Sequence, residues 1–223
     1  MITIFHGDNF VLSRKVFNEQ IDEFKGEKIR FTAKKLDETK LTQSLESNSL
    51  FGDTKLVIIE NLLTLPRSKA KDKFIELVLH NKDSEIVLWE KKAITPAVKK
   101  KFAGATIKEF KLPASVFKVL DSLKPGSGKV TLKLLHDCLK KDAAELVFYM
   151  LHRRVSQLIQ ATKEGQLKGA PWQIGKLKSQ SQNFKLETLL KLHQDLLNID
   201  FTIKTGQAVL PLASQLDLLL INI

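Results

Sequence analysis

The sequence predicts an α/β domain at residues 1–112 followed by an all-α domain at residues 113–223. Two observations lead to this fold class. From residue 2 to residue 112, short apolar runs alternate with segments of helical periodicity, and several of the runs are apolar on both faces. After Pro113 the strand signals stop, and apolar residues recur every three or four positions. The first pattern is typical of a parallel sheet covered on both sides, and the second of a helical bundle.

The first domain contains five runs with the composition of buried strands, separated by segments with helical spacing. Turn-forming residues separate the runs, as expected where strands and helices are joined by short loops. The strands are expected at residues 2–7, 28–36, 55–62, 85–91 and 105–112, and the helices at 10–25, 38–47, 68–80 and 96–102. This order predicts a small doubly wound domain with a five-stranded parallel sheet.

The second domain reads as helices throughout. In the longest segment, apolar side chains repeat at Phe148, Leu151, Val155 and Leu158, which places them on one face of a helix. Pro171 is expected to open a short helix, because proline is favoured in the first turn. The helices are expected at residues 114–123, 130–140, 143–163, 171–178 and 186–204, with one more in the apolar C-terminal segment.

The composition indicates a folded, basic protein. The chain has 223 residues, of which 43% are apolar, and a net charge of +11 that is shared by both halves. A broadly basic surface is expected of a protein that works near nucleic acid or an acidic partner, although many basic proteins do neither. The only cysteine is Cys138, and the N-terminus does not read as a signal peptide. We therefore expect a cytoplasmic protein with no membrane segment.

Two segments resemble phosphate-binding loops without fulfilling the pattern. The loop needs Gly, four residues and then Gly-Lys-Ser/Thr, so that backbone N–H groups surround the phosphates and the hydroxyl reaches magnesium. Residues 125–131, PGSGKVT, have Leu123 at the first glycine position and Val130 after the lysine. After the first strand, Gly7 is followed by Leu-Ser at residues 12–13, where Gly-Lys would stand. We expect a helix stop and restart at the first segment and no bound nucleotide at either.

No other constellation of residues indicates catalysis or a metal site. The histidines lack the i, i+4 pairing of a helical zinc site, and no Gly-x-Ser-x-Gly elbow is present. The five histidines are His6, His80, His136, His152 and His193. We expect no catalytic residues, no cofactor and no metal, and hence a protein that is not an enzyme by itself.

Leu50 and Phe51 are two large apolar residues in a polar bend, just before the turn Gly52-Asp53 and the apolar run that follows. Two interpretations are open. The pair can close the core between a helix and a strand, or it can face outward as an anchor for another protein. The residue pattern alone favours the first.

Three segments, taken in order, make the chain resemble the delta subunit of the bacterial DNA polymerase III clamp loader. They are FHGDNFVLSRKVF after the first strand, SNSLFGDTKLVIIEN before the third, and LLNIDFTIKTGQ ahead of the last helix. Residues 116–159 are also similar to the first helices of that family's C-terminal collar domain.

The resemblance implies a specific function. Delta is similar in fold to AAA+ and RecA-like ATPases but has a degenerate domain without a working phosphate loop. It binds the ring-shaped sliding clamp (beta) and opens it for loading onto primed DNA during replication, as part of the DNA polymerase III holoenzyme. Its collar packs against the other clamp-loader subunits. The family's clamp contact is a Leu-Phe pair at the position of Leu50 and Phe51, which favours the anchor interpretation for these residues.

The sequence departs from the family in two respects, and the first is a basic stretch after the fourth strand, EKKAITPAVKKKF at residues 90–102, which differs from the charged pattern expected there. The family normally has a small helical lid domain between its N-terminal domain and its collar. Residues 105–121 here pass almost directly from one to the other. We therefore expect a shortened delta that lacks the lid, or a relative of delta with altered duties.

Charged residues supply the remaining candidates. Five lysines follow the fourth strand, near Trp89, and they are either a solvated face or a contact to DNA phosphates: Lys91, Lys92, Lys99, Lys100 and Lys101. Arg153 and Arg154 either cover apolar surface while their charges reach water, or make a contact with another protein of the complex. Asp200 and Lys204, at i and i+4, are expected to pair on one helix.

Two other functions stay open at this point. The chain can be a basic DNA-binding module that acts alone, or a scaffold protein derived from a nucleotide-binding domain. Clamp binding favours the delta-like function, salt-sensitive DNA binding without a clamp favours the second, and self-assembly with neither favours the third.

Overall fold

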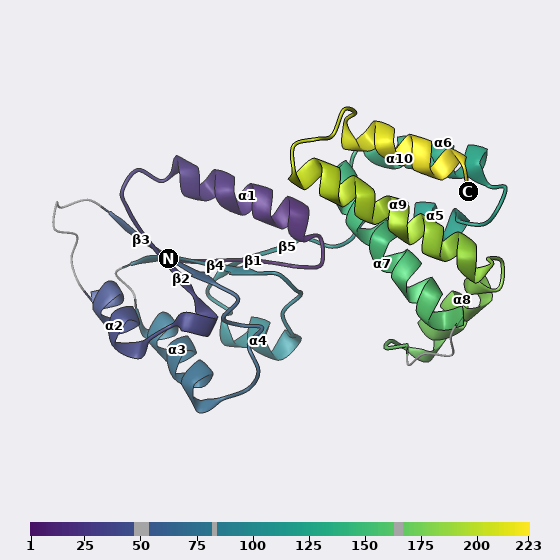
Figure 1. Ribbon diagram of the computed structural model, residues 1–223. Helices are drawn as coiled ribbons and strands as arrows, with labels where there is room; N and C mark the ends of the chain where they lie inside the picture. The colour runs from purple at the N-terminus through teal and green to yellow at the C-terminus, as the bar shows by residue number, and fades with distance from the viewer. Residues whose placement is uncertain (47–53, 82–83, 163–166) are drawn as a thin grey trace. The chain divides into compact units, whose positions relative to one another are not determined.

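The computed structural model describes residues 1–46, 54–81, 84–162 and 167–223. The chain divides into two compact units, Met1–Leu112 and Pro113–Ile223 (Figure 1). Within the described ranges, no helix is both long and apolar enough to cross a bilayer.

The first unit is built on a parallel sheet of five strands, as predicted. The strands lie in the order β2-β3-β4-β1-β5, and every neighbouring pair is parallel. The three inner strands are buried on both faces, which is why their sequences are almost continuously apolar. The strands are β1 (Ile2–His6), β2 (Glu27–Thr32), β3 (Lys55–Glu60), β4 (Glu85–Glu90) and β5 (Thr106–Glu109).

Helices cover both faces of this sheet. Helix α1 (Phe10–Glu23) lies on one face, and α2 (Glu38–Glu46), α3 (Lys69–His80) and α4 (Pro96–Lys101) lie on the other (Figure 1). Two apolar cores result. Phe5, Phe17 and Trp89 pack under α1, and Ile4, Leu88, Phe102 and their neighbours pack under α2, α3 and α4. The prediction of a sheet covered on both sides is confirmed.

The two outer strands are shorter than predicted. After Thr32 the chain turns into a 3-10 helix, Ala33–Lys35, instead of continuing β2. After Glu109, Phe110 still donates its N–H to the carbonyl of His6, but it accepts its next hydrogen bond from Asn9 N–H and so leaves the ladder. Edge strands have a neighbour on one side only, so their apolar pattern does not fix where pairing ends.

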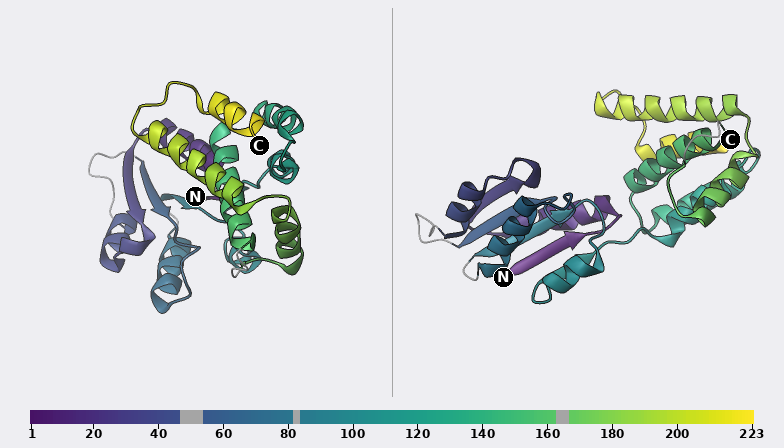
Figure 2. Two further views of the ribbon diagram at one scale, coloured as in Figure 1. Left: turned by 45° about the vertical axis from the view of Figure 1, so that its right-hand side comes forward. Right: turned by 90° about the horizontal axis from the view of Figure 1, so that it is seen from below.

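The second unit is all helical. It contains α5 (Ala114–Ser122), α6 (Gly128–Leu139), α7 (Ala144–Thr162), α8 (Pro171–Ser181), α9 (Leu186–Lys204) and α10 (Leu212–Ile221). Helix α7 packs against α5, α8, α9 and α10 (Figure 2). It supplies the centre of the core through Val147, Leu151, Val155 and Leu158. The predicted bundle, including the helix opened by Pro171, is confirmed.

Candidate functional site

The predicted clamp contact, Leu50 and Phe51, lies outside the described residues. The chain that leads to it is firmly held up to Leu45. The Leu45 side chain is buried, and its carbonyl accepts hydrogen bonds from Asn81 Nδ2 at 3.0 Å and Ser84 Oγ at 3.2 Å. The last turn of α2 is thereby fixed to the connection between α3 and β4.

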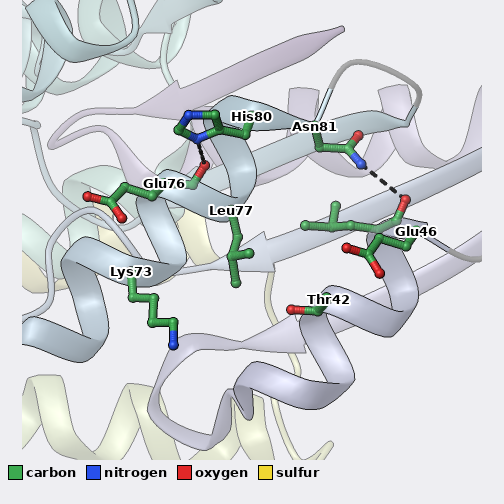
Figure 3. Close-up of a pocket in the computed structure, with 8 residues that line it drawn as sticks. Thr42, Glu46, Lys73, Glu76, Leu77, His80 and Asn81 are labelled. Carbon is green, nitrogen blue, oxygen red and sulfur yellow. Dashed lines mark hydrogen bonds between the residues drawn. The ribbon is translucent and has the colours of Figure 1, made fainter.

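A groove of about 560 Å³ lies between α2 and α3, next to this point (Figure 3). One wall is formed by Thr42, Leu45 and Glu46 of α2, and the other by side chains of α3 and Asn81. The His80 ring nitrogen Nδ1 lies 2.8 Å from the carbonyl oxygen of Glu76, as the dashed line in Figure 3 marks. The groove contains both acidic and basic groups, so it suits a polar segment of a partner better than a purely apolar one.

The lysines predicted to contact DNA do not form one free cationic cluster. Lys99 pairs with Glu109 at 2.7 Å, and Lys101 pairs with Asp72 at 3.7 Å. The Lys91 ammonium lies 5.4 Å from the centre of the Phe10 ring. Lys92 and Lys100 are exposed. Because two of the five charges are neutralised within the unit, the electrostatic case for this patch is weaker than the sequence suggests.

The carboxyl edge of the sheet is the usual ligand position in a parallel α/β domain. In this chain, the backbone of Phe110, just after β5, packs against the connection from β1 to α1. A Cβ on Gly7 would lie 2.1 Å from the carbonyl oxygen of Phe110, and Asn9 N–H donates to that oxygen at 3.0 Å. The Asn9 side chain accepts from Leu12 N–H at 3.2 Å, so it uses a donor at the start of α1. This geometry leaves little room for a phosphate.

Acidic side chains at the same edge are also engaged. Glu60, which ends β3, pairs with Arg14 at 2.8 Å, and the hydrogen bond from Arg14 lowers the pKa of its carboxyl group. Glu90, which ends β4, is buried and accepts hydrogen bonds from Leu63 N–H and from both the N–H and the hydroxyl of Thr64. Burial raises the pKa of Glu90, although its hydrogen bonds oppose the shift. Glu60 thus joins β3 to α1, and Glu90 holds the loop that contains Leu63 and Thr64.

His6, which ends β1, is the unusual group at this edge. Its side chain is fully buried, and neither ring nitrogen has a hydrogen-bond partner among the described residues. Burial lowers the pKa of the imidazole, and the nearby charge of Lys99 lowers it further. The sequence predicted no role for His6.

The Gly-Ser-Gly-Lys segment is a helix stop and restart, as predicted. Helix α5 ends at Ser122 and α6 begins at Gly128. The Ser127 hydroxyl lies 2.7 Å from the carbonyl of Lys124 and 2.9 Å from that of Ser122. A Cβ on Gly128 would lie 2.7 Å from the carbonyl oxygen of Ile221, so this glycine allows α10 to approach closely. The segment is part of the packing of the helical unit.

Arg153 and Arg154 have different surroundings. Arg153 is exposed, as expected. The expectation that the charge of Arg154 also reaches water is wrong, because its side chain is only 10% exposed. Its guanidinium lies 2.7 Å from Gln180 Oε1 and 3.2 Å from Asp121 Oδ1. Adjacent residues point about 100° apart around a helix, so Arg154 lies on the core side of α7 with Leu151 and Val155 while Arg153 faces outward.

Sequence reasoning missed an exposed aromatic residue on α8. Trp172 is 70% exposed, whereas Trp89 is buried. The sequence around it contains Lys168, Lys176, Lys178 and Lys185, and no acidic residue between positions 167 and 186. That combination of lysines without acids around a tryptophan was the available signal. Exposed aromatic rings beside cations are typical of surfaces that bind single-stranded nucleic acid.

A second missed surface is apolar. Val209 is 95% exposed, and Leu210 and Leu218 are also exposed. These side chains line a shallow groove of about 430 Å³ between α9 and α10. On the outer side of α9, Leu190, Leu197 and Phe201 are exposed as well. Clustered exposed apolar side chains mark a surface that binds another protein.

The described residues contain no group of three or more side chains suited to hold a metal ion. The predicted pair of Asp200 and Lys204 is confirmed, at 2.6 Å. The rings of His152 and His193, from α7 and α9, lie 4.9 Å apart, although they are far apart in sequence.

The comparisons with known proteins agree with this architecture. Residues 114–222 match the family model for the C-terminal domain of the DNA polymerase III delta subunit. No curated protein matches the sequence. The structure is similar to that of the Bacillus subtilis DNA clamp loader delta protein (YqeN), with 13% sequence identity and a TM-score of 0.50, over 99% of this chain and 94% of that one. Residues 114–222 are therefore similar to the C-terminal domain of the DNA polymerase III delta subunit, and the chain as a whole shares the fold of a clamp loader delta protein.

Proposed function

We propose that this chain is a clamp-loader subunit that binds a sliding clamp and holds one of its interfaces open during loading onto primed DNA. The match of the helical unit to the delta C-terminal domain carries this proposal. The fold shared with a clamp loader delta protein supports it. Opening a ring by binding requires contacts that favour the opened form over the closed one, because a ligand shifts an equilibrium only by its differential affinity.

The proposed clamp contact is the segment that carries Leu50 and Phe51. Burying each side chain in a pocket on the clamp contributes about 1.5–3 kcal/mol, so losing both costs about 3–6 kcal/mol, or about two to four powers of ten in affinity. The groove between α2 and α3 supports this location, since it offers a polar surface beside the start of the segment.

The test is a clamp-binding measurement on the wild type and on a variant with Leu50→Ala and Phe51→Ala. We expect the double variant to lose clamp binding while its melting temperature stays nearly unchanged. Leu12→Ala is the matched control, because Leu12 is an exposed apolar residue of the same unit. A large drop in melting temperature would show that Leu50 and Phe51 belong to the core instead, and wild-type protein that does not bind a clamp would refute the proposal.

In this proposal the chain does not hydrolyse ATP, which its partners bind. Packing at the carboxyl edge of the sheet supports the absence of a bound nucleotide: backbone atoms of Phe110 lie against Gly7, and Glu60 pairs with Arg14. Equilibrium titration with a fluorescent ATP analogue, with and without magnesium, tests this. Saturable binding to the isolated chain would contradict it.

The apolar surface of α9 and α10 is the proposed contact with other clamp-loader subunits. Val209 supports this assignment, since its side chain is almost fully exposed in the isolated chain. Val209→Asp is expected to weaken assembly with the ATPase subunits without affecting clamp binding. Size-exclusion chromatography of the reconstituted complex measures this effect, and unchanged assembly would place the contact elsewhere.

DNA is the remaining proposed partner. The α8 surface around Trp172 supports a contact to single-stranded template, because bases can stack on the ring while the nearby lysines attract phosphates. The exposed Lys92 and Lys100 remain candidates for a second contact. If the chain binds DNA in a salt-sensitive way but does not bind the clamp, a DNA-binding module that acts alone is favoured instead.

A further inference from the structure

One carboxylate of α5 is shared between a cation of α7 and a cation of α8. Asp121, in the last turn of α5, lies 3.2 Å from Arg154 Nη1 through Oδ1 and 2.5 Å from Lys176 Nζ through Oδ2. Arg154 has a second acceptor in Gln180 Oε1 at 2.7 Å. Gln180 in turn donates through Nε2 to the carbonyls of Leu120 and Leu123. This network ties α5, α7 and α8 together.

The two partners of Asp121 differ in their access to solvent. The Arg154 side chain is 10% exposed and is bound on two sides, so it stays inside the unit. The Lys176 side chain is 51% exposed. Lys176 also lies four residues after Trp172 on the same helix, which places the two side chains on one face of α8. A phosphate beside a base stacked on Trp172 is therefore within reach of Lys176 but not of Arg154.

A half-exposed ion pair exchanges partners easily. Its net contribution is small, because solvent and salt screen it and because both side chains lose rotamer freedom. The Lys176 ammonium can therefore leave Asp121 for a phosphate. Asp121 is not left alone in that event, because Arg154 still holds its other oxygen. The carboxylate nevertheless repels the phosphate and competes for the same ammonium.

We propose that Asp121 restrains Lys176 and so lowers the affinity of the α8 surface for the phosphates of single-stranded DNA. The inference rests on the DNA contact of the proposed function, and it adds a residue that sets the strength and the salt dependence of that contact. DNA binding replaces the pair of Lys176 with Asp121 by a pair of Lys176 with phosphate. No sequence preference follows, since phosphates are common to all sequences.

The test is a titration of the full chain with oligo(dT), read by quenching of Trp172 fluorescence. Trp172→Phe establishes the background, because Trp89 is buried in the other unit. The test variant is Asp121→Asn, which keeps an oxygen for Arg154 but removes the charge beside Lys176. We expect Asp121→Asn to bind about two- to fivefold more tightly, as an exposed ion pair implies. The slope of log affinity against log salt should steepen by up to about 0.7, since one more cation is free for phosphate.

A double-mutant cycle with Lys176→Met separates this restraint from a general effect of charge. We expect Asp121→Asn to change nothing when Lys176 is already methionine. Asp217→Asn is the matched control: it removes one negative charge from the same unit, where Asp217 pairs with His136 at 2.8 Å, and should change the affinity by less than twofold.

Each outcome is decisive. Unchanged or weaker binding by Asp121→Asn, or a gain that persists with Lys176→Met, overturns the restraint while leaving the DNA contact standing. If the wild-type chain shows no quenching beyond that of Trp172→Phe, the DNA contact itself fails and the restraint fails with it. Circular dichroism and melting curves of every variant confirm that the fold is retained.

Discussion

Replacement of His6 by leucine is expected to stabilise the first unit, most strongly in mild acid. The imidazole is fully buried at the end of β1, and neither ring nitrogen is hydrogen-bonded within the described part of the chain. A buried polar group without a partner costs about 1–3 kcal/mol. Leucine removes that cost and adds apolar contacts, at the risk of a small misfit in shape. We therefore expect His6→Leu to raise the free energy of unfolding by about 1–2 kcal/mol at pH 7.5.

The pH dependence follows from the direction of the pKa shift. Burial, followed by the charge of Lys99, lowers the pKa of His6 in the folded state. Below about pH 6.5 the imidazole binds a proton in the unfolded chain but stays neutral in the folded chain. The free energy of unfolding of the wild type therefore decreases as the pH falls from about 6.5 toward the folded pKa. The loss from one such group is at most about 1.4 kcal/mol per pH unit. His6→Leu should remove this slope, so its advantage grows in acid.

Trp89 makes the assay specific to the first unit, since it is buried in the core under α1. In a Trp172→Phe background, denaturation followed by fluorescence reports the unfolding of that unit alone. His80→Gln is the control, because it replaces an exposed histidine of the same unit. Lower stability of His6→Leu at pH 7.5, or an acid slope equal to that of the wild type, would refute the reasoning about an unpaired imidazole.

Three further predictions concern packing and buried polar groups. Gly128→Ala should lower the melting temperature, because the new Cβ would lie 2.7 Å from backbone of α10, whereas Gly175→Ala should raise it slightly, since nothing lies within 4 Å and alanine favours a helix by up to about 1 kcal/mol. Equal effects in thermal melts would contradict the role of close packing. Arg154→Met should destabilise the helical unit by about 1–3 kcal/mol, because Gln180 Oε1 loses its donor inside the unit while Asp121 keeps only its exposed pair with Lys176; a neutral result in denaturant titrations would exclude a structural role. Glu90→Ala should cost the first unit about 2–4 kcal/mol and increase backbone amide exchange at Leu63 and Thr64, and unchanged exchange would show that Glu90 does not hold this loop.

The amino-acid sequence by itself determined which segments form strands and helices. Apolar runs such as the one ending at Glu60 identify inner strands, and the spacing along α7 identifies its buried face. These signals are local, because a strand repeats every two residues and a helix every 3.6. The order of the segments then indicated a parallel sheet followed by a bundle, and the resemblance to delta depended on the order of short motifs in the same way.

Only the tertiary structure decided the state of individual polar side chains. Arg154 is buried, although the sequence predicted that its charge reaches water. Trp172 is exposed, although the sequence predicted no role for it. Lys99 and Lys101 meet their acidic partners from other elements, so charge along the chain overstated the free charge of that patch. The physical reason is that burial, pairing and desolvation depend on residues brought together from distant parts of the chain, and a periodic pattern contains no information about those neighbours.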